Sequence, residues 1–191
     1  MEMLKGLDSL TLREKIAYTI PENWKFKPVL CLAGISEQEL YYVVSEKPLA
    51  GGAVALKGAR SFTLYLLDGQ GQEILYFEKR SGFFASRVEI FDGAENLLGA
   101  VQKHGTPSRP HFLVSDAGGK ILCGIEETAG GGDAFTISRN SVSVGTISRK
   151  WISPVPENGP KNDHFGIVFP FESDVSERSV LLGALLFIDF L

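Results

Sequence analysis

The chain ends in an almost unbroken apolar block, and this block limits what the chain can fold into. From Val180 to Leu191 every residue is apolar or Gly except Asp189. Asp174 precedes the block with Glu177 three residues later, a spacing in which the two side chains reciprocally cap the start of a helix. A helix that is apolar on all sides must be buried on all sides, either in a bilayer or inside a protein.

The length of the block favours the protein interior. Spanning the hydrocarbon of a bilayer takes roughly 20 apolar residues, and this run is shorter and interrupted by Asp189. We therefore expect a helix enclosed by strands, with shallow membrane insertion as the alternative. A buried Asp189 would need a partner or a route to solvent. The residues expected to be buried along the helix are Val180, Leu181, Leu182, Leu185, Leu186, Phe187, Ile188, Asp189 and Phe190.

The middle of the chain, residues 61–148, repeats a β-hairpin pattern. Apolar alternation leads into a Gly-containing turn at Asp68 and then resumes, and similar turns begin at Asp92 and Asp116, 24 residues apart each time. A fourth hairpin is expected around residues 139–140. Because so many short strands would otherwise leave exposed edges, we expect a closed antiparallel barrel.

The same alternation extends toward the N-terminus. Apolar residues fall on even positions in residues 10–20, which indicates a strand. A short helix is the competing interpretation, since Thr11 and Glu14 have capping-box spacing, but the enrichment in Thr, Tyr and Ile favours the strand. Residues 29–32 and 40–44 are further strand candidates.

Composition narrows the class of protein. The chain has 191 residues and a formal net charge of -4, which argues against generic nucleic-acid binding. No convincing linker divides it, so we expect a single domain over residues 1–191. Cys31 and Cys123 are too few for a disulfide framework, and no apolar signal segment opens the chain, so a cytoplasmic location with buried, inert thiols is expected.

Signatures of catalysis are missing from the sequence. It has no phosphate-binding loop and no serine nucleophile elbow, and His104, His111 and His164 lack metal-ligand spacing. We therefore expect that the protein is not an enzyme.

The run DHFGIVFPFESDVSERSVLLGALLFIDF, residues 163–190, resembles the C-terminal signature of the phospholipid scramblase family. FTLYLLDGQGQEILYFEKR, ENLLGAV and VGTISRKW match upstream in the same order, so the resemblance covers roughly residues 60–191. It implies the tubby C-terminal-like fold, shared with plant LURP-one-related proteins. That fold is mainly β, with about a dozen antiparallel strands closed around a central hydrophobic C-terminal helix.

The resemblance also implies a function at membranes. We expect a scramblase-family protein that binds phospholipids or translocates them between leaflets, associated peripherally with a membrane surface rich in anionic lipids. The alternative is a soluble tubby-like module that binds lipid headgroups or a protein partner without transport. Residues 145–151 resemble a region that some scramblases use for nuclear import, but they hold only two adjacent basic residues, Arg149 and Lys150.

Calcium (Ca²⁺) is the one cofactor that the resemblance implies. Calcium takes 6–8 oxygen ligands. Lys161 stands where the family has its first acidic ligand, Asp163 and Glu172 keep theirs, and Ile167 offers only a backbone carbonyl. Asp163, Glu172 and Ile167 are thus candidate ligands of a degenerate site. The favoured interpretation is instead a barrel strand within residues 164–170.

Membrane attachment differs from the family pattern as well. Residues 81–86 read SGFFAS where vertebrate scramblases carry a palmitoylated cysteine cluster, so acyl anchoring is not expected. A loop with two phenylalanines and basic flanks suits an anionic interface, where each basic residue adds about 1 kcal/mol. The alternative is an inward-packed aromatic pair beside ordinary surface charges. The candidate membrane-contact residues are Phe83, Phe84, Lys79, Arg80 and Arg87.

Overall fold

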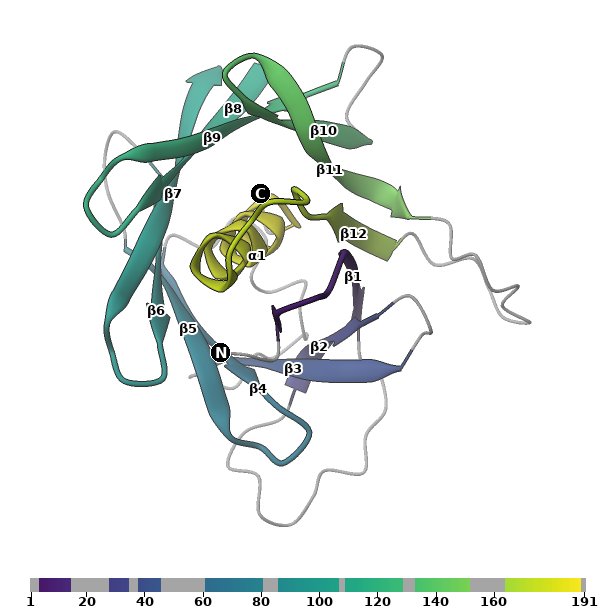
Figure 1. The fold of residues 1–191 in the computed structure, drawn as a ribbon. Helices are drawn as coiled ribbons and strands as arrows, with labels where there is room; N and C mark the ends of the chain where they lie inside the picture. Colours follow the sequence, from purple (N-terminus) through teal and green to yellow (C-terminus); the bar gives the residue numbers. More distant parts are fainter. Residues whose placement is uncertain are drawn as a thin grey trace.

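A closed antiparallel barrel surrounds one helix (Figure 1). The computed structural model describes residues 4–14, 28–34, 38–45, 61–80, 86–106, 109–128, 133–151 and 164–189. Within these ranges the strands are β1 (Ser9–Glu14), β2 (Pro28–Ala33), β3 (Glu39–Ser45), β4 (Phe62–Leu67), β5 (Glu73–Lys79), β6 (Arg87–Asp92), β7 (Leu97–Thr106), β8 (Arg109–Asp116), β9 (Ile121–Glu127), β10 (Ala134–Arg139), β11 (Val142–Trp151) and β12 (His164–Val168), and the helix is α1 (Val175–Asp189).

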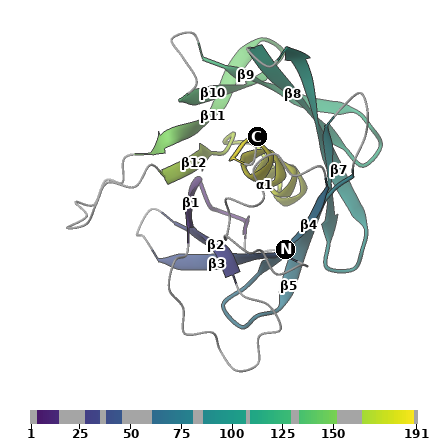
Figure 2. The same ribbon diagram turned by 180° about the vertical axis from the view of Figure 1, so that it is seen from behind.

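The strands follow one another around the barrel in chain order. Each pairs with its neighbours in sequence, and β1 pairs with β12 to close the ring, with Ser9 opposite Val168. Both ribbon views place α1 inside this ring (Figures 1 and 2). The expected closed β-barrel around a C-terminal helix is therefore confirmed. The first predicted strand is found as β1 over Ser9–Glu14, and residues 15–20 lie outside the described residues.

Aspartate side chains fix the three predicted hairpin turns. The Oδ1 atom of Asp68 accepts backbone N–H bonds from Gln70 and Gln72, at 2.8 and 2.9 Å. Asp92 accepts both corresponding bonds in its turn, from Ala94 and Asn96, and Asp116 accepts one, from Lys120. Such side-chain bonds replace backbone partners and favour Asp at the first turn position. The fourth predicted hairpin joins β10 to β11 through residues 140 and 141, which both have positive φ, as a two-residue type I′ turn requires.

The core lies between the inner faces of the strands and α1. Residues 180–188 of the helix are all buried, and Asp189 is half-buried. Two glycines allow the helix and the wall to approach closely. A Cβ on Gly183 would lie 2.5 Å from Ile90 Cγ1, and one on Gly99 would clash with the Ser115 carbonyl oxygen and lie 2.8 Å from Val180 Cγ2.

The start of α1 differs in one respect from the expected capping box. The Asp174 carboxylate accepts the Glu177 backbone N–H at 2.8 Å, so the cap itself is confirmed. Glu177 does not complete the reciprocal bond, and this part of the prediction is wrong. Its Oε1 instead accepts a bond from Arg139 Nη2 on β10 at 2.5 Å. The buried Glu177 therefore links the helix to the barrel wall.

Arg178 connects the helix to the N-terminal segment. Its buried Nη1 donates to the carbonyl oxygens of Leu7 at 2.7 Å and Leu4 at 3.2 Å. Its Nε donates to the hydroxyl of Ser173 at 3.0 Å, and the guanidinium lies 5.6 Å from the centre of the Phe169 ring. One side chain thus joins residues 4–7, the loop before α1 and the helix.

Replacing Arg178 by Met should lower the free energy of unfolding by about 3 kcal/mol, because several buried carbonyl groups lose a charged donor together. Chemical denaturation measures the loss, and hydrogen exchange should show faster exchange in residues 4–8. Arg178→Lys keeps the charge but makes fewer hydrogen bonds, so its free energy of unfolding should fall by about half as much. Equal stability of Arg178→Met and the wild type would show that these bonds contribute nothing net.

Replacing Gly99 by Ala should destabilise the barrel by about 2 kcal/mol, since the new methyl group meets the Ser115 backbone, which cannot move aside without disturbing the β7–β8 ladder. Gly124→Ala on β9 is the matched control, because a Cβ there meets nothing within 4 Å. We expect the control to change the unfolding midpoint little. Similar losses of stability in both variants would contradict the close approach of Gly99 to the Ser115 backbone.

Candidate functional site

Lys79 lies inside the barrel near the end of α1. It is only 7% exposed, and its Nζ lies 5.6 Å from the ring centres of Phe62 and Phe187. Lys79 shares the inner face of β5 with Phe77 two residues before it, which is why its side chain points inward. Burial, followed by the nearby Lys103, lowers the pKa of Lys79. The expectation that Lys79 contacts a membrane is therefore wrong.

A second cation lies at the same end of the barrel. The guanidinium of Arg149 on β11 is 5.6 Å from the ring centres of both Phe135 and Phe165. The last turn of α1 carries no basic residue of its own. Lys79 and Arg149 therefore bring positive charge from the strands to the helix C-terminus, where the helix dipole favours it.

Arg80 and Arg87 point outward from the barrel at this end. Their side chains are 71% and 45% exposed and form ion pairs with Glu78 at 2.9 Å and Glu89 at 3.3 Å. Exposed pairs of this kind stabilise a fold by about 1 kcal/mol or less, so the arginines can exchange these partners for others. The two arginines flank residues 81–85, which lie outside the described residues. The expected membrane contact of Phe83 and Phe84 therefore stays a prediction.

Two further basic residues belong to the same side. The Lys103 backbone N–H donates to the Ser86 carbonyl at 2.9 Å, which places β7 beside the start of β6. Arg109 is exposed at the start of β8. Lys103 shares the inner face with its buried cross-strand partner Phe112. We therefore call the three outer residues the basic edge: Arg80, Arg87 and Arg109. It lies at the barrel end where α1 terminates.

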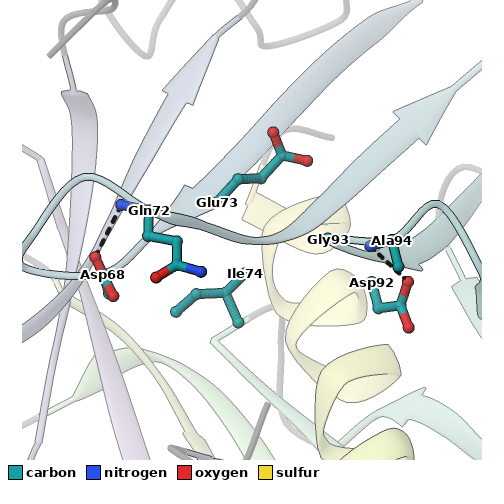
Figure 3. Close-up of a pocket in the computed structure, with 7 residues that line it drawn as sticks. All are labelled: Asp68, Gln72, Glu73, Ile74, Asp92, Gly93 and Ala94. Atoms are coloured by element: carbon teal, nitrogen blue, oxygen red, sulfur yellow. Dashed lines mark hydrogen bonds between the residues drawn. The ribbon is translucent and has the colours of Figure 1, made fainter.

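The opposite end of the barrel carries acidic groups. A pocket of about 380 Å³ lies between the β4–β5 and β6–β7 turns. Figure 3 shows Asp68 and Asp92 on its two sides, with Glu73 and Ile74 between them. Burial, and then the charge of Glu95, raises the pKa of Glu73. The remaining residues that line the pocket are Gln72, Gly93 and Ala94, so its described lining holds three carboxylates and no cation.

Exposed apolar residues also lie at this acidic end. Phe171, in the loop between β12 and α1, is 92% exposed, and Val142 and Ile121 begin β11 and β9. Phe171 is followed by the exposed residues Glu172 and Asp174. The most exposed large apolar side chain thus lies among carboxylates, away from the basic edge.

The candidate calcium ligands are only partly described. Lys161 and Asp163 lie outside the described residues. Ile167 is buried within β12 between Leu10 of β1 and Ile147 of β11, so its backbone belongs to the sheet ladder. Glu172 is exposed. The hydrogen bond from Arg139 to Glu177 raises the pKa of Arg139, and the charge of Glu172 adds to this effect.

The described candidates offer one carboxylate, Glu172, and one backbone position within the sheet, Ile167. The strand prediction for residues 164–170 holds for His164–Val168, which form β12. No group of three His, Cys, Asp or Glu residues in the described ranges is placed to hold a metal ion. Calcium ligation therefore gains no support from Ile167 or Glu172.

The fold brings together two histidines that sequence spacing does not connect. His104 and His111 are direct cross-strand partners on β7 and β8, and their rings stack with centres 5.3 Å apart. Their positions, symmetric about residues 107–108, were the one sequence signal that could have revealed the pair. Cys31 and Cys123 are buried thiols outside any disulfide, and burial raises the pKa of Cys123 to about 12, which keeps that thiol protonated.

The position of α1 agrees with the expected helix enclosed by strands. In the part of the chain that the structure describes, no helix has the length and apolar character needed to cross a bilayer. Phe190 lies outside that part.

Comparison with known proteins agrees with the architecture. Residues 32–191 match the family model called Scramblase. Human phospholipid scramblase 1 is 27% identical over 151 residues, which cover 70% of this chain and 46% of that protein. Mouse phospholipid scramblase 1 is 30% identical over 149 residues, covering 70% and 45%. Human phospholipid scramblase family member 5 is 24% identical over 173 residues, covering 81% and 62%.

The chain spans about half the length of most of the curated relatives it matches. An X-ray structure of a protein from Arabidopsis thaliana is similar in fold, with a TM-score of 0.53 and 14% identity over 95% of this chain and 88% of that one. The family match runs from β2 to the end of α1 and includes the whole hairpin series. The chain therefore belongs to the scramblase family and has the tubby C-terminal-like fold that its sequence predicts.

Proposed function

We propose that this protein binds anionic phospholipid membranes peripherally, with the basic edge facing the lipid. The observation that carries the proposal is the uneven distribution of charge along the barrel. Arg80 and Arg87 flank the β5–β6 connection at one end, while Asp68, Glu73 and Asp92 gather at the other. Membership of a family whose named relatives are phospholipid scramblases supports lipid as the partner.

The enclosed helix supports binding over transport in this conformation. Residues 180–188 fill the barrel interior, so an acyl chain could pass through the barrel only if α1 left it. Expelling a helix that is apolar on all sides would expose several large side chains, each worth about 1.5–3 kcal/mol on burial. Translocation between leaflets is the second candidate function, and the names of the relatives favour it.

Calcium is not part of the proposed interaction. The described candidates offer one exposed carboxylate, Glu172, and one backbone position within a sheet, Ile167. A calcium ion needs several converging oxygen atoms. Attraction between arginine and lipid phosphate requires no such ion, and the proposed role is binding without catalysis.

Replacing both Arg80 and Arg87 by Gln should weaken partition onto vesicles of phosphatidylcholine and phosphatidylserine about thirtyfold, because each basic residue near an anionic surface contributes about 1 kcal/mol. Co-sedimentation measures the effect. Lys5→Gln/Lys120→Gln is the matched control, since it removes the same charge from exposed positions away from the basic edge. Equal weakening by the control would refute the orientation. A loss of binding in Phe171→Ser alone would mean that the other end faces the membrane.

Vesicles with a fluorescent lipid in both leaflets separate binding from translocation. We expect the protein to pellet with the vesicles while the outer-leaflet fraction that dithionite bleaches stays unchanged. Adding calcium or a chelator should alter neither result. Bleaching that reaches the inner-leaflet lipid in intact vesicles would favour translocation, and a gain of binding on adding calcium would contradict calcium independence.

A further inference from the structure

The outer face of β4, β5 and β6 carries a row of aromatic side chains. Tyr65, Tyr76 and Phe91 are direct cross-strand partners. The Tyr76 and Phe91 rings stack with centres 4.5 Å apart and planes 7° apart, and the Tyr65 ring lies 6.1 Å from that of Tyr76. All three are half-exposed. We call these three residues the aromatic strip.

Carboxylates surround one end of the aromatic strip. Burial, followed by the charges of Glu95, Glu78 and Glu73, raises the pKa of Tyr76, so its hydroxyl lies within the field of three acidic groups. Glu78 is paired with Arg80. Glu73 and Glu95 form no ion pair with any residue that the structure describes. Each repels the other, and a cation placed between them would relieve that repulsion.

Aromatic faces beside carboxylates are suited to organic cations. Arginine and lysine side chains lie over aromatic rings within about 6 Å of the ring centre, and arginine also stacks flat against them. The acidic pocket shares Glu73 with this region and has about 380 Å³ of space, which leaves room for a long cationic side chain. An anionic membrane surface would be repelled by the same carboxylates.

We propose that the aromatic strip, with Glu73 and Glu95, docks a basic segment of a partner protein, whose arginine or lysine side chains lie over Tyr76 and Phe91 and reach toward the two carboxylates. Charge complementarity selects this occupant. The strip crosses β4, β5 and β6, and Glu73 and Glu95 lie on its side toward the acidic turns, whereas the basic edge lies at the other end of β5 and β6. Partner and membrane can therefore be bound together, and the proposal does not depend on membrane binding.

Fluorescence anisotropy with a labelled octapeptide of alternating Arg and Gly tests the proposal on the full chain. Glu73→Gln/Glu95→Gln should raise the Kd about tenfold, as expected for two exposed ion pairs. Asp8→Asn/Glu126→Gln is the charge-matched control on other parts of the surface and should leave the Kd nearly unchanged. An unchanged Kd in the first variant, or an equal rise in the control, overturns the proposal.

Tyr76→Leu tests the aromatic part without altering the net charge. We expect the Kd for the same peptide to rise about threefold, in line with an exposed cation–π contact. Chemical denaturation of each variant confirms that the barrel is intact. A Kd equal to that of the wild type would remove the aromatic strip from the proposal.

Vesicles of pure phosphatidylcholine distinguish a lipid headgroup from a protein segment. We expect Glu73→Gln/Glu95→Gln to leave vesicle binding unchanged. If that variant loses binding to these vesicles but keeps the peptide, the strip holds a choline headgroup and the protein-docking proposal fails. Failure of the peptide experiment would leave the basic edge untouched, because Arg80→Gln/Arg87→Gln reports on that surface separately.

Discussion

The burial of α1 is the constraint on which the rest of the structure depends. A helix that is apolar all round has no side that can face water, so strands must cover it on every side. A sheet can do this without leaving exposed edges only by closing on itself, which β1 and β12 achieve by pairing. Gly99 and Gly183 then bring wall and helix close enough to pack.

Closure of the barrel also decides where polar groups can act. With the interior filled, Lys79 and Arg149 lie over aromatic rings at the end of the helix, and Glu177 and Arg178 anchor its beginning. Other molecules can therefore be bound only at the two rims and on the outer face of the barrel. There the basic edge lies at one rim, and Asp68, Glu73 and Asp92 line a pocket at the other. The basic edge is suited to anionic partners, and the acidic pocket is suited to cationic ones.

Local patterns predicted most of the fold. The three turn aspartates and the Asp174 cap depend on residues a few positions apart and are found where the sequence predicts them. The fourth turn lies at residues 140 and 141, one residue later than expected. The apolar block and the need to cover strand edges predicted a closed barrel around the helix, and the resemblance added the expected number of strands, about a dozen.

Prediction failed where long-range geometry decides the outcome. Lys79 looked like part of a basic loop, yet strand alternation turns it inward beside Phe187. Glu177 found a partner on β10 that lies 38 residues away in the chain. The stacked pair of His104 and His111, and the rings of Tyr65, Tyr76 and Phe91, depend on strand register, which fixes contacts that spacing alone does not reveal.

The order of the elements has a consequence for how the chain folds as it is synthesised. The strands emerge from the ribosome before the helix that fills them, so their inner faces have nothing to pack against until α1 is complete. The seam between β1 and β12 likewise joins residues at opposite ends of the chain. Contacts of such long range form late and slowly, and the incomplete sheet exposes apolar surface and unpaired edges in the meantime. Nascent chains of this fold are therefore most prone to aggregation before α1 has been made.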